Sequence, residues 1–278
     1  MVDRGVAYRL ERASPPSVEV GGEIRYGRSD AVPSLLDESA TGLATVVFLA
    51  SADQKANRRS LAAFDDAAPP EAQVVVVADG VDPGPTSHET IRTPSVLGRG
   101  AALNIGIRRA SAAVVIALDP SIIPSGDVVT PLVEALRDPS VAVVGPFGLA
   151  STDLRRFDEM VRSTQPVDVA AIQGQLIAFR RADVAARGPI DEAFRFHRHL
   201  DVWLSLVLRD EGEGHVPRRA VVVPGLPLER GESSVMGLTP EAARDRLSRR
   251  NFYRVLDRFR TRDDLAVPAP TVRSGTDS

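Results

Sequence analysis

The sequence predicts an α/β protein in which a parallel or mixed β-sheet is covered by helices on both faces. Four short runs of apolar, β-branched residues carry this prediction; they lie at 44–50, 72–78, 112–118 and 141–144. The runs are apolar throughout instead of alternating with polar residues, which is typical of strands buried on both faces. Helices are expected between them, at about 54–66, 99–110 and 127–137. This alternation of strands and helices favours a layered α/β sheet.

The pattern becomes less regular after Gly145. Four further elements are expected there: a strand at 168–179, a loop at 188–198, a helix at 200–210 and a strand at 216–223. The helix is predicted because its apolar residues recur at intervals of three and four. We therefore expect the main α/β domain to extend over 41–225.

The two ends of the chain differ from this domain. Residues 1–40 predict a β-hairpin or an irregular flap, because short β-type pieces are interrupted by Gly21 and Gly22. Residues 226–265 are expected to form a linker and a helix, and 266–278 a flexible tail. The helix is predicted to start with Thr239 as its N-cap and Pro240 in the first helical position.

The last helix carries an apolar stripe at helical spacing, formed by Phe252, Val255, Leu256 and Phe259. A stripe of this size is too apolar to leave in water. We expect the helix to dock on the main domain. A homodimer interface is the alternative.

The composition excludes several classes of function. The 278 residues are 43% hydrophobic and 26% charged, as in an ordinary globular protein, and the net charge of −3 argues against nucleic-acid binding through a broad basic field. There is no cysteine, which excludes disulfide frameworks, zinc fingers and thiol nucleophiles. Lys55 is the only lysine and lies in no Walker sequence, so a P-loop is not expected.

The sequence also bears on location. No run approaches the ~18 to 20 apolar residues of a transmembrane helix, and residues 1–10 lack the apolar region of a signal peptide. The absence of cysteine fits a reducing compartment. We expect a cytoplasmic protein, with peripheral attachment at the inner membrane face left open.

Polar residues follow each of the first three predicted strands. Ser51 and Asp53 follow the first, Asp79 the second and Asp119 the third. Ligands of open α/β sheets bind beyond the carboxyl ends of the strands, and three carboxylates there suit ribose or sugar hydroxyls or a cation. The alternative is that these residues only start turns.

Gly98-Arg99-Gly100 leads into a predicted helix that also contains Asn104. An arginine between glycines at a helix N-terminus can approach an anion, helped by free backbone N–H groups. The segment is not a dinucleotide fingerprint, because the third small residue is missing and it does not follow the first strand. A plain loop-to-helix junction is the alternative.

Asp201 lies in the first turn of the 200–210 helix and off its apolar stripe, so it can face a cleft as a general base. The alternative is that it only complements the helix dipole. His197 and His199 flank Arg198; without a third ligand in the pattern they are interpreted as loop residues.

Taken in order, these motifs resemble the family-2 glycosyltransferases of GT-A fold, in a bacterial form. The resemblance runs from about Thr45 to Arg262. It rests on GRGAALNIG at 98–106, on 112–146 with Asp119 and the VGP strand end, on 169–192, and on HLDVW at 199–203. Arg249-Arg250-Asn251-Phe252-Tyr253 is similar to a bacterial subgroup of the family.

The resemblance implies a Rossmann-like GT-A sheet with a C-terminal helical extension, and transfer of a sugar from a nucleotide-diphosphate donor to a hydroxyl of a saccharide or other acceptor, with inversion. It implies that Asp201 is the catalytic base and that Asp119 binds a divalent metal, Mg²⁺ or Mn²⁺. The implied donor-binding residues are Ser51, Asp53, Asp79, Arg99, Asn104 and Asp119. The implied acceptor-side residues are Gln173, Gly174, Asp191, Glu192 and Trp203.

The chain departs from the family pattern in two places. Ser121 stands where the second acid of the DxD motif is usual, and Pro227-Leu228-Glu229-Arg230-Gly231 stands where a late histidine is usual. Both places concern the metal and the diphosphate, so we expect weak or nucleotide-dependent metal binding, with an arginine such as Arg230 stabilising the diphosphate. The alternative is a non-catalytic protein that serves as a nucleotide-sugar sensor or a scaffold.

Overall fold

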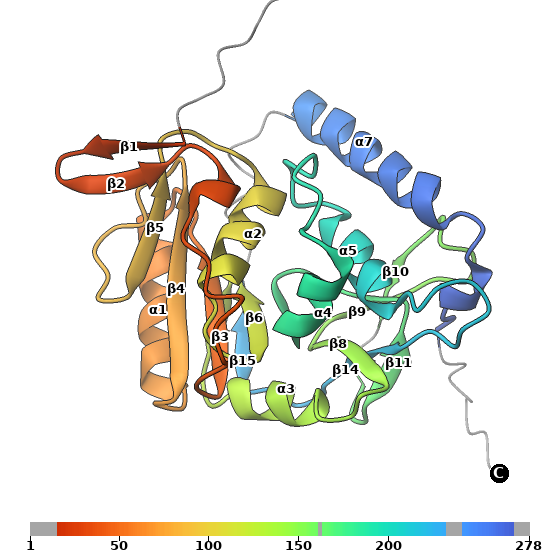
Figure 1. The fold of residues 1–278 in the computed structure, drawn as a ribbon. Helices are drawn as coiled ribbons and strands as arrows, with labels where there is room; N and C mark the ends of the chain where they lie inside the picture. Colours follow the sequence, from red (N-terminus) through yellow and green to blue (C-terminus); the bar gives the residue numbers. More distant parts are fainter. Residues whose placement is uncertain (1–15, 161–162, 232–240, 270–278) are drawn as a thin grey trace, which may run out of the picture.

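The computed structural model describes residues 16–160, 163–231 and 241–269, and its centre is a mixed sheet (Figure 1). The sheet consists, in spatial order, of β1 (Ser17–Val20), β2 (Glu23–Tyr26), β5 (Glu89–Thr93), β4 (Ala72–Asp79), β3 (Ala44–Leu49), β6 (Val114–Leu118), β13 (Leu176–Arg180), β8 (Val141–Gly145), β14 (Arg219–Val222) and β11 (Val167–Val169). β3 pairs in parallel with β4 and β6, whereas β13 lies antiparallel between β6 and β8. The predicted fold class is confirmed.

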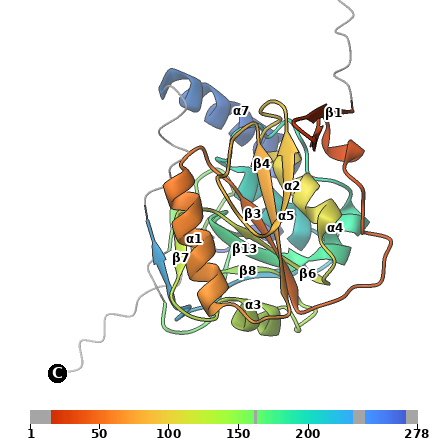
Figure 2. The ribbon, with the colours of Figure 1, turned by 90° about the vertical axis from the view of Figure 1, so that its left-hand side faces the viewer.

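Helices pack on both faces of the sheet, and strand alternation explains which core each face builds. The helices are α1 (Gln54–Ala67), α2 (Arg99–Arg109), α3 (Val129–Ala135), α4 (Arg181–Arg187), α5 (Leu200–Arg209) and α7 (Glu241–Phe259). Val46 and Phe48 of β3 share a core with α1 and α3, whereas Val47 between them shares a core with α2, α4 and α5. Figures 1 and 2 show α1 and α5 on opposite sides of the strands.

One glycine brings α2 close to the sheet. A Cβ added at Gly106 would lie 2.1 Å from Cγ1 of Val47. Only a residue without a side chain permits this packing distance, so the α2 register that places Arg99 at the edge of the sheet depends on it.

The strand predicted at 168–179 is three strands in two sheets. β11 joins the central sheet, β12 (Ala171–Ile172) pairs with β9 (Gly148–Ala150) in a smaller sheet that also holds β10 (Asp158–Glu159), and β13 returns to the central sheet. The apolar pieces at 169–172 and 176–179 are buried alike, so their composition does not reveal that they belong to different sheets. The break leaves residues 173–175 outside any strand, where their side chains can serve a site.

The predicted flap is a β-hairpin, β1–β2, whose turn residues Gly21 and Gly22 have φ of +60° and +81°. A pairing that the sequence did not predict lies near the other end of the chain. β15 (Leu228–Arg230), within a stretch expected to be a connection, pairs with β7 (Ile122–Pro124). This pairing brings Arg230 opposite Ile122, directly after the Asp119–Ser121 segment.

α7 packs on the rest of the fold through part of its predicted stripe. Val255 and Phe259 are buried, while Phe252 and Leu256 are half-buried. Asn251 donates from Nδ2 to the carbonyls of Phe196 and Arg198, both at 2.9 Å. The start predicted at Thr239 and Pro240 lies outside the described residues, as does most of the tail.

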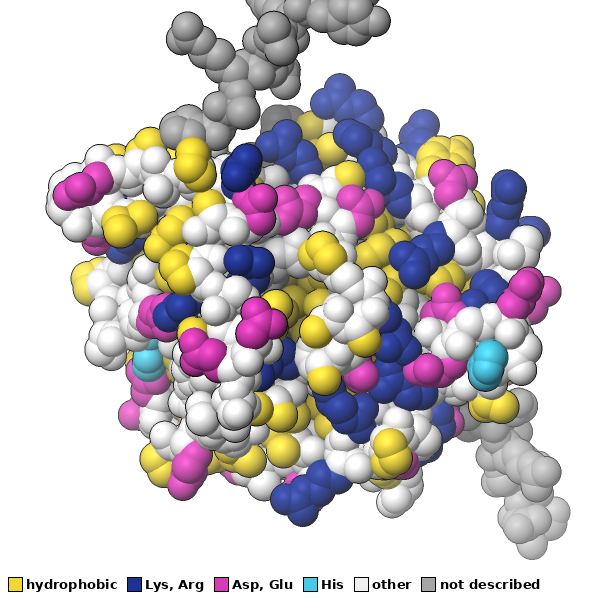
Figure 3. All heavy atoms as spheres, viewed as in Figure 1, with side chains coloured by type: hydrophobic (Ala, Val, Ile, Leu, Met, Phe, Trp, Pro, Cys, Tyr) yellow, Lys and Arg dark blue, Asp and Glu magenta, His cyan; other side chains and the backbone are white. Residues whose placement is uncertain are grey.

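The outer face of α7 is basic. Arg246, Arg249 and Arg250 are exposed on it, and Figure 3 shows the arginines gathered over this helix. Among the described residues, none of the helices is both long and apolar enough to cross a membrane. The division into domains stays a prediction.

Candidate functional site

A cavity of about 900 Å³ opens beyond the carboxyl end of β6, between α2, α5 and the loop that follows β12. Its polar lining consists of Arg99, Asp119, Ser121, Glu159, Gln173, Gln175, His197, Arg198, His199, Asp201, Arg230 and Ser248. Gly174 also lines it. The structure thus brings together five of the residues to which the resemblance assigns a donor, acceptor or catalytic role: Arg99, Asp119, Gln173, Gly174 and Asp201.

Asp119 is almost fully buried at the edge of this cavity. Its Oδ1 accepts from the backbone N–H of Ser121 at 3.0 Å and from the Ser121 hydroxyl at 2.8 Å. Its Oδ2 pairs with Nη2 of Arg99 at 3.2 Å. Both carboxylate oxygens therefore have partners within the protein.

These contacts test whether the site fits a divalent metal ion. Such an ion requires several oxygen ligands, but Asp119 is the single carboxylate of this segment and already faces a guanidinium. Among the described residues, no group of three His, Asp or Glu side chains could hold a metal. As arranged, the residues do not fit a resident Mg²⁺ or Mn²⁺.

The N-terminus of α2 is not an open anion site. The N–H of Arg99 donates to the carbonyl of Arg195 at 3.1 Å, and that of Gly100 to the carbonyl of Phe194 at 3.0 Å. The backbone donors expected to face an anion are thus engaged by the 194–195 loop. The contribution of this segment to the cavity is the Arg99 side chain alone.

Asp201 lies across the cavity in the first turn of α5. Its Oδ2 accepts from the backbone N–H of Gly174 at 3.0 Å and its Oδ1 from that of Val202 at 2.9 Å. Burial raises the pKa of Asp201 above its ordinary value, although these hydrogen bonds and Arg99 oppose the shift. A carboxylate with a raised pKa in a cavity suits proton transfer.

The turn before Asp201 is strained. His199, the N-cap of α5, has φ of +66°, a left-handed conformation that non-glycine residues rarely adopt. Its ring lies 5.3 Å from that of Phe252 on α7. Strain of this kind is common where a site must hold a fixed geometry.

His197 was not expected in the site, yet it lines the cavity. Burial, followed by the charge of Arg99, lowers its pKa to about 4, so the ring is neutral at pH 7. Its Nδ1 is buried and has no hydrogen-bond partner among the described residues. No sequence signal separates His197 from an ordinary loop histidine, and His199 stands out only as the start of the HLDVW stretch.

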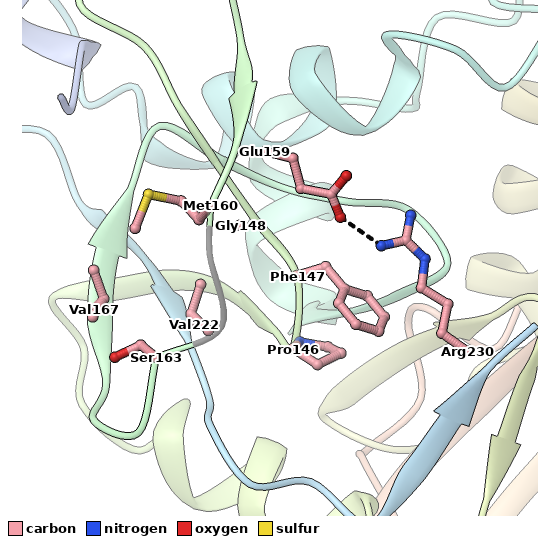
Figure 4. Close-up of a pocket in the computed structure, with 9 residues that line it drawn as sticks. All are labelled: Pro146, Phe147, Gly148, Glu159, Met160, Ser163, Val167, Val222 and Arg230. Atoms are coloured by element: carbon pink, nitrogen blue, oxygen red, sulfur yellow. Dashed lines mark hydrogen bonds and ion pairs between the residues drawn. The ribbon is translucent and has the colours of Figure 1, made fainter. Parts of the chain in front are cut away.

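Arg230 enters the cavity from β15. Its Nη1 lies 2.7 Å from Oε1 of Glu159, its Nη2 donates to Oε1 of Gln173 at 3.0 Å, and its guanidinium lies 4.5 Å from the ring centre of Phe147. Figure 4 shows Arg230 beside Glu159 and Phe147, at the edge of an adjoining pocket of about 190 Å³. The guanidinium therefore lies between the cavity and this adjoining pocket.

Three of the strand-end residues do not line the cavity. Ser51 bonds with Asn57, and Asp53 is the N-cap of α1, accepting from the N–H groups of Lys55 and Ala56. Asp79 accepts from the Thr93 hydroxyl and from the backbone of residues 97 and 98, so it shapes the loop before α2. Their oxygens accept hydrogen bonds from the protein's own backbone. A role for these three residues toward the nucleotide stays a prediction.

Four other candidates are also outside the cavity lining. Asn104 exchanges hydrogen bonds with the backbone of Ile190 at 2.9 Å and donates to Glu192, so both fix the 190–192 loop on α2. Asp191 pairs with Arg254 of α7 at 2.9 Å. Trp203 is buried against Phe194. These contacts fix the loop at 190–194 against α2, α5 and α7.

No family model matches the chain, and no curated protein is similar to it. Solved structures do resemble its fold. The structure of GalNAc-T7 with UDP, GalNAc and Mn²⁺ matches with a TM-score of 0.61 and 16% identity, over 80% of this chain and 48% of that one. The mannosyltransferase PcManGT from Pyrobaculum calidifontis, in complex with GDP-Man and Mn²⁺, matches with a TM-score of 0.47 and 16% identity, over 67% and 57%.

The chain thus spans about half the length of the GalNAc-T7 chain. The likeness establishes that this protein has the GT-A fold of glycosyltransferases.

Proposed function

We propose that this protein transfers a sugar from a nucleotide-diphosphate donor to an acceptor hydroxyl, with inversion at the anomeric carbon. One observation carries the proposal: a carboxylate of raised pKa, Asp201, faces the same cavity as the guanidinium groups of Arg99 and Arg230. Glycosyl transfer needs a base for the acceptor and positive charge for the leaving diphosphate. The GT-A fold, found in structures with UDP or GDP-Man, supports this.

In the proposed reaction, Asp201 takes the proton of the acceptor hydroxyl. The acceptor oxygen forms a bond to the anomeric carbon from the side opposite the diphosphate, and the bond to the diphosphate oxygen breaks. The backbone N–H groups of Gly174 and Val202 occupy one lone pair on each Asp201 oxygen. The second lone pairs remain for the acceptor, and the hydrogen bonds fix the direction in which they point.

The arginines serve the donor side in this proposal. Arg99 is held by Asp119, and Arg230 by Glu159 and Gln173. No step depends on a resident metal. Mg²⁺ or Mn²⁺ would need phosphate oxygens of the donor to complete a ligand set with Asp119, so metal binding is expected only in the nucleotide complex.

A non-catalytic nucleotide-sugar sensor or scaffold is the second candidate. The observation that favours it is the ion pair between Arg99 and Asp119, which together with Ser121 uses both oxygens of the carboxylate. Such a protein would bind the donor and leave it intact.

A thermal-shift screen followed by a turnover assay separates these functions. UDP, GDP, dTDP and their sugar derivatives are added with and without Mn²⁺. A ligand at 100 times its Kd stabilises the protein by about 2.7 kcal/mol. Stabilisation followed by release of nucleoside diphosphate in the presence of hydroxyl acceptors supports the transferase. Stabilisation without release from any donor supports the sensor, and the absence of any shift contradicts both.

A further inference from the structure

We propose that Arg230 and Gln173 form a phosphate-binding pair, which takes the diphosphate of the ligand without a metal ion. This inference rests on the proposed function for the identity of the ligand. The anion-binding chemistry itself is argued from the two side chains alone.

The first argument is an unpartnered donor. Gln173 is 7% exposed, and its Oε1 accepts from Arg230. The other end of the amide, Nε2, is buried and makes no hydrogen bond of good geometry among the described residues. It lies close enough to the exposed Glu159 carboxylate to help Arg230 lower the pKa of that group, so a phosphate that displaces Glu159 from Arg230 also gains this donor. A flip of the amide would bring its N–H groups against the guanidinium, so the orientation is fixed. A buried donor without an acceptor costs free energy unless a ligand supplies one.

The second argument is the way Arg230 is held. Its guanidinium lies over the ring of Phe147, and one terminal nitrogen contacts Glu159 (Figure 4). The other terminal nitrogen donates to Gln173. These contacts use two of the five N–H groups of an arginine. The remaining donors lie in a plane fixed before any ligand arrives, which favours bidentate binding of phosphate oxygens.

The third argument compares the two arginines. Arg99 pairs with a carboxylate whose side chain is 6% exposed, whereas the partner of Arg230, Glu159, is 58% exposed. An ion pair with an exposed carboxylate contributes little, so a phosphate group competes readily with Glu159. The pairing of β15 with β7 holds Arg230 beside the Asp119–Ser121 segment. Of these two arginines, Arg230 is therefore the one that can change partners at the donor side.

The test measures binding by calorimetry in EDTA. The ligands are UDP, GDP, dTDP, their nucleosides and inorganic pyrophosphate. Arg230→Ala should lower the affinity for the nucleoside diphosphates and pyrophosphate about 10- to 100-fold and leave the affinity for the nucleosides unchanged. Arg230→Lys should recover part of the loss, because it restores charge without the planar fork. Gln173→Ala should lower the affinity for the same diphosphates about 5- to 10-fold.

Two controls isolate the contact from general charge. Arg156→Ala removes an arginine that is 82% exposed and paired with Asp158, next to Glu159 but outside the cavity lining; it should leave affinity unchanged. The double variant Arg230→Ala/Glu159→Gln also removes the carboxylate that Arg230→Ala would leave unpaired. Its affinity for the diphosphates should stay as low as that of Arg230→Ala. Melting temperatures verify that each variant is folded.

The outcomes separate this inference from the proposed function. If a nucleoside diphosphate binds and Arg230→Ala behaves like Arg156→Ala, or if the double variant regains affinity, the pair does not bind phosphate although the donor site stands. If only pyrophosphate binds and Arg230→Ala abolishes it, the anion site stands and the nucleotide donor is wrong. If the wild type binds neither kind of ligand in EDTA, metal-free phosphate binding is overturned.

Discussion

Polar residues lie at the edge of the sheets in three places: the end of β3, the end of β4 and the segment after β12. They differ in whether the protein itself supplies their hydrogen-bond partners. At the first two, the carboxylates of Asp53 and Asp79 hold backbone N–H groups of their own loops. At the third, Gln173 keeps a buried donor that makes no hydrogen bond of good geometry within the described part of the chain, and Asp201 in the same cavity has a raised pKa. The difference indicates that Gln173 and Asp201 have hydrogen-bonding capacity left for a ligand, whereas Asp53 and Asp79 use theirs to hold the protein's own loops.

The contrast follows from what each residue type can satisfy locally. A short side chain at the start of a helix or turn reaches backbone donors two or three residues away, as Asp53 does. Asp201 instead meets the backbone N–H of Gly174 across 27 residues of sequence, and Gln173 meets Arg230 across 57. We therefore expect variants of Asp53 and Asp79 to change stability, and variants of Asp201 and Gln173 to change activity.

The largest effect is expected for Asp201→Asn, which keeps the shape of the side chain and removes its basicity. Loss of a general base lowers the rate about 10²- to 10⁴-fold. Because burial raises the pKa of Asp201, the basic form is lost on acidification at a higher pH than for an ordinary aspartate. The wild-type kcat/KM should rise with pH through that raised pKa, and the variant should lack this limb. Turnover by Asp201→Asn close to wild type would contradict the assignment.

A large loss of stability is expected for Asp79→Ala. The carboxylate accepts three hydrogen bonds, from Thr93, Leu97 and Gly98, at 2.7 to 2.9 Å. Leaving these donors without a partner should cost about 3 kcal/mol, measured by urea unfolding. Asp66→Ala, an exposed site on α1, is the control and should change little. If Asp79→Ala keeps its stability and loses nucleotide affinity, β4 belongs to the binding group and the contrast between the regions fails.

A smaller effect is expected for Gly174→Ala. Its Cβ would lie 3.2 Å from Cβ of Asp201, so the carboxylate must move by a few tenths of an ångström. We expect kcat to fall about tenfold, since misplacement by 1 Å can cost 10²-fold. The hydrogen bond from the Gly174 N–H lowers the pKa of Asp201, and lengthening it should move the acid limb to higher pH. A fall in kcat with an unmoved limb would assign Gly174 a merely structural role.

The sequence was sufficient for most of the fold because strand and helix patterns are local. It placed β3, β4, β6, β8 and α5 within a few residues, and it grouped Arg99, Asp119 and Asp201 near one another. It could not show that residues 171–172 leave the central sheet, because apolar residues fill both sheets.

The sequence pattern did not predict the hydrogen-bond partners of individual polar groups. Asn104 meets Ile190 across 86 residues, and His197 becomes a lining residue only because the loop folds over Arg99. A polar residue that hydrogen-bonds to a distant backbone group and one that binds a ligand cannot be distinguished in a sequence. Hydrogen-bond partners decide between them, and these require the fold.

The smallest effect is expected for Asp53→Ala, which tests the contrast most directly. Asp53 was a candidate for the nucleotide, but its Oδ1 accepts from the N–H groups of Lys55 and Ala56 at 3.0 and 3.1 Å, as an N-cap does. Loss of a cap costs about 1 kcal/mol, or a drop in melting temperature of roughly 2 to 4 °C for a chain of this size. Asp53→Asn retains an oxygen acceptor and should recover most of it. Calorimetry should give the same nucleotide affinity for all three proteins; a weaker affinity in Asp53→Ala that Asp53→Asn does not restore would move the donor site to the end of β3.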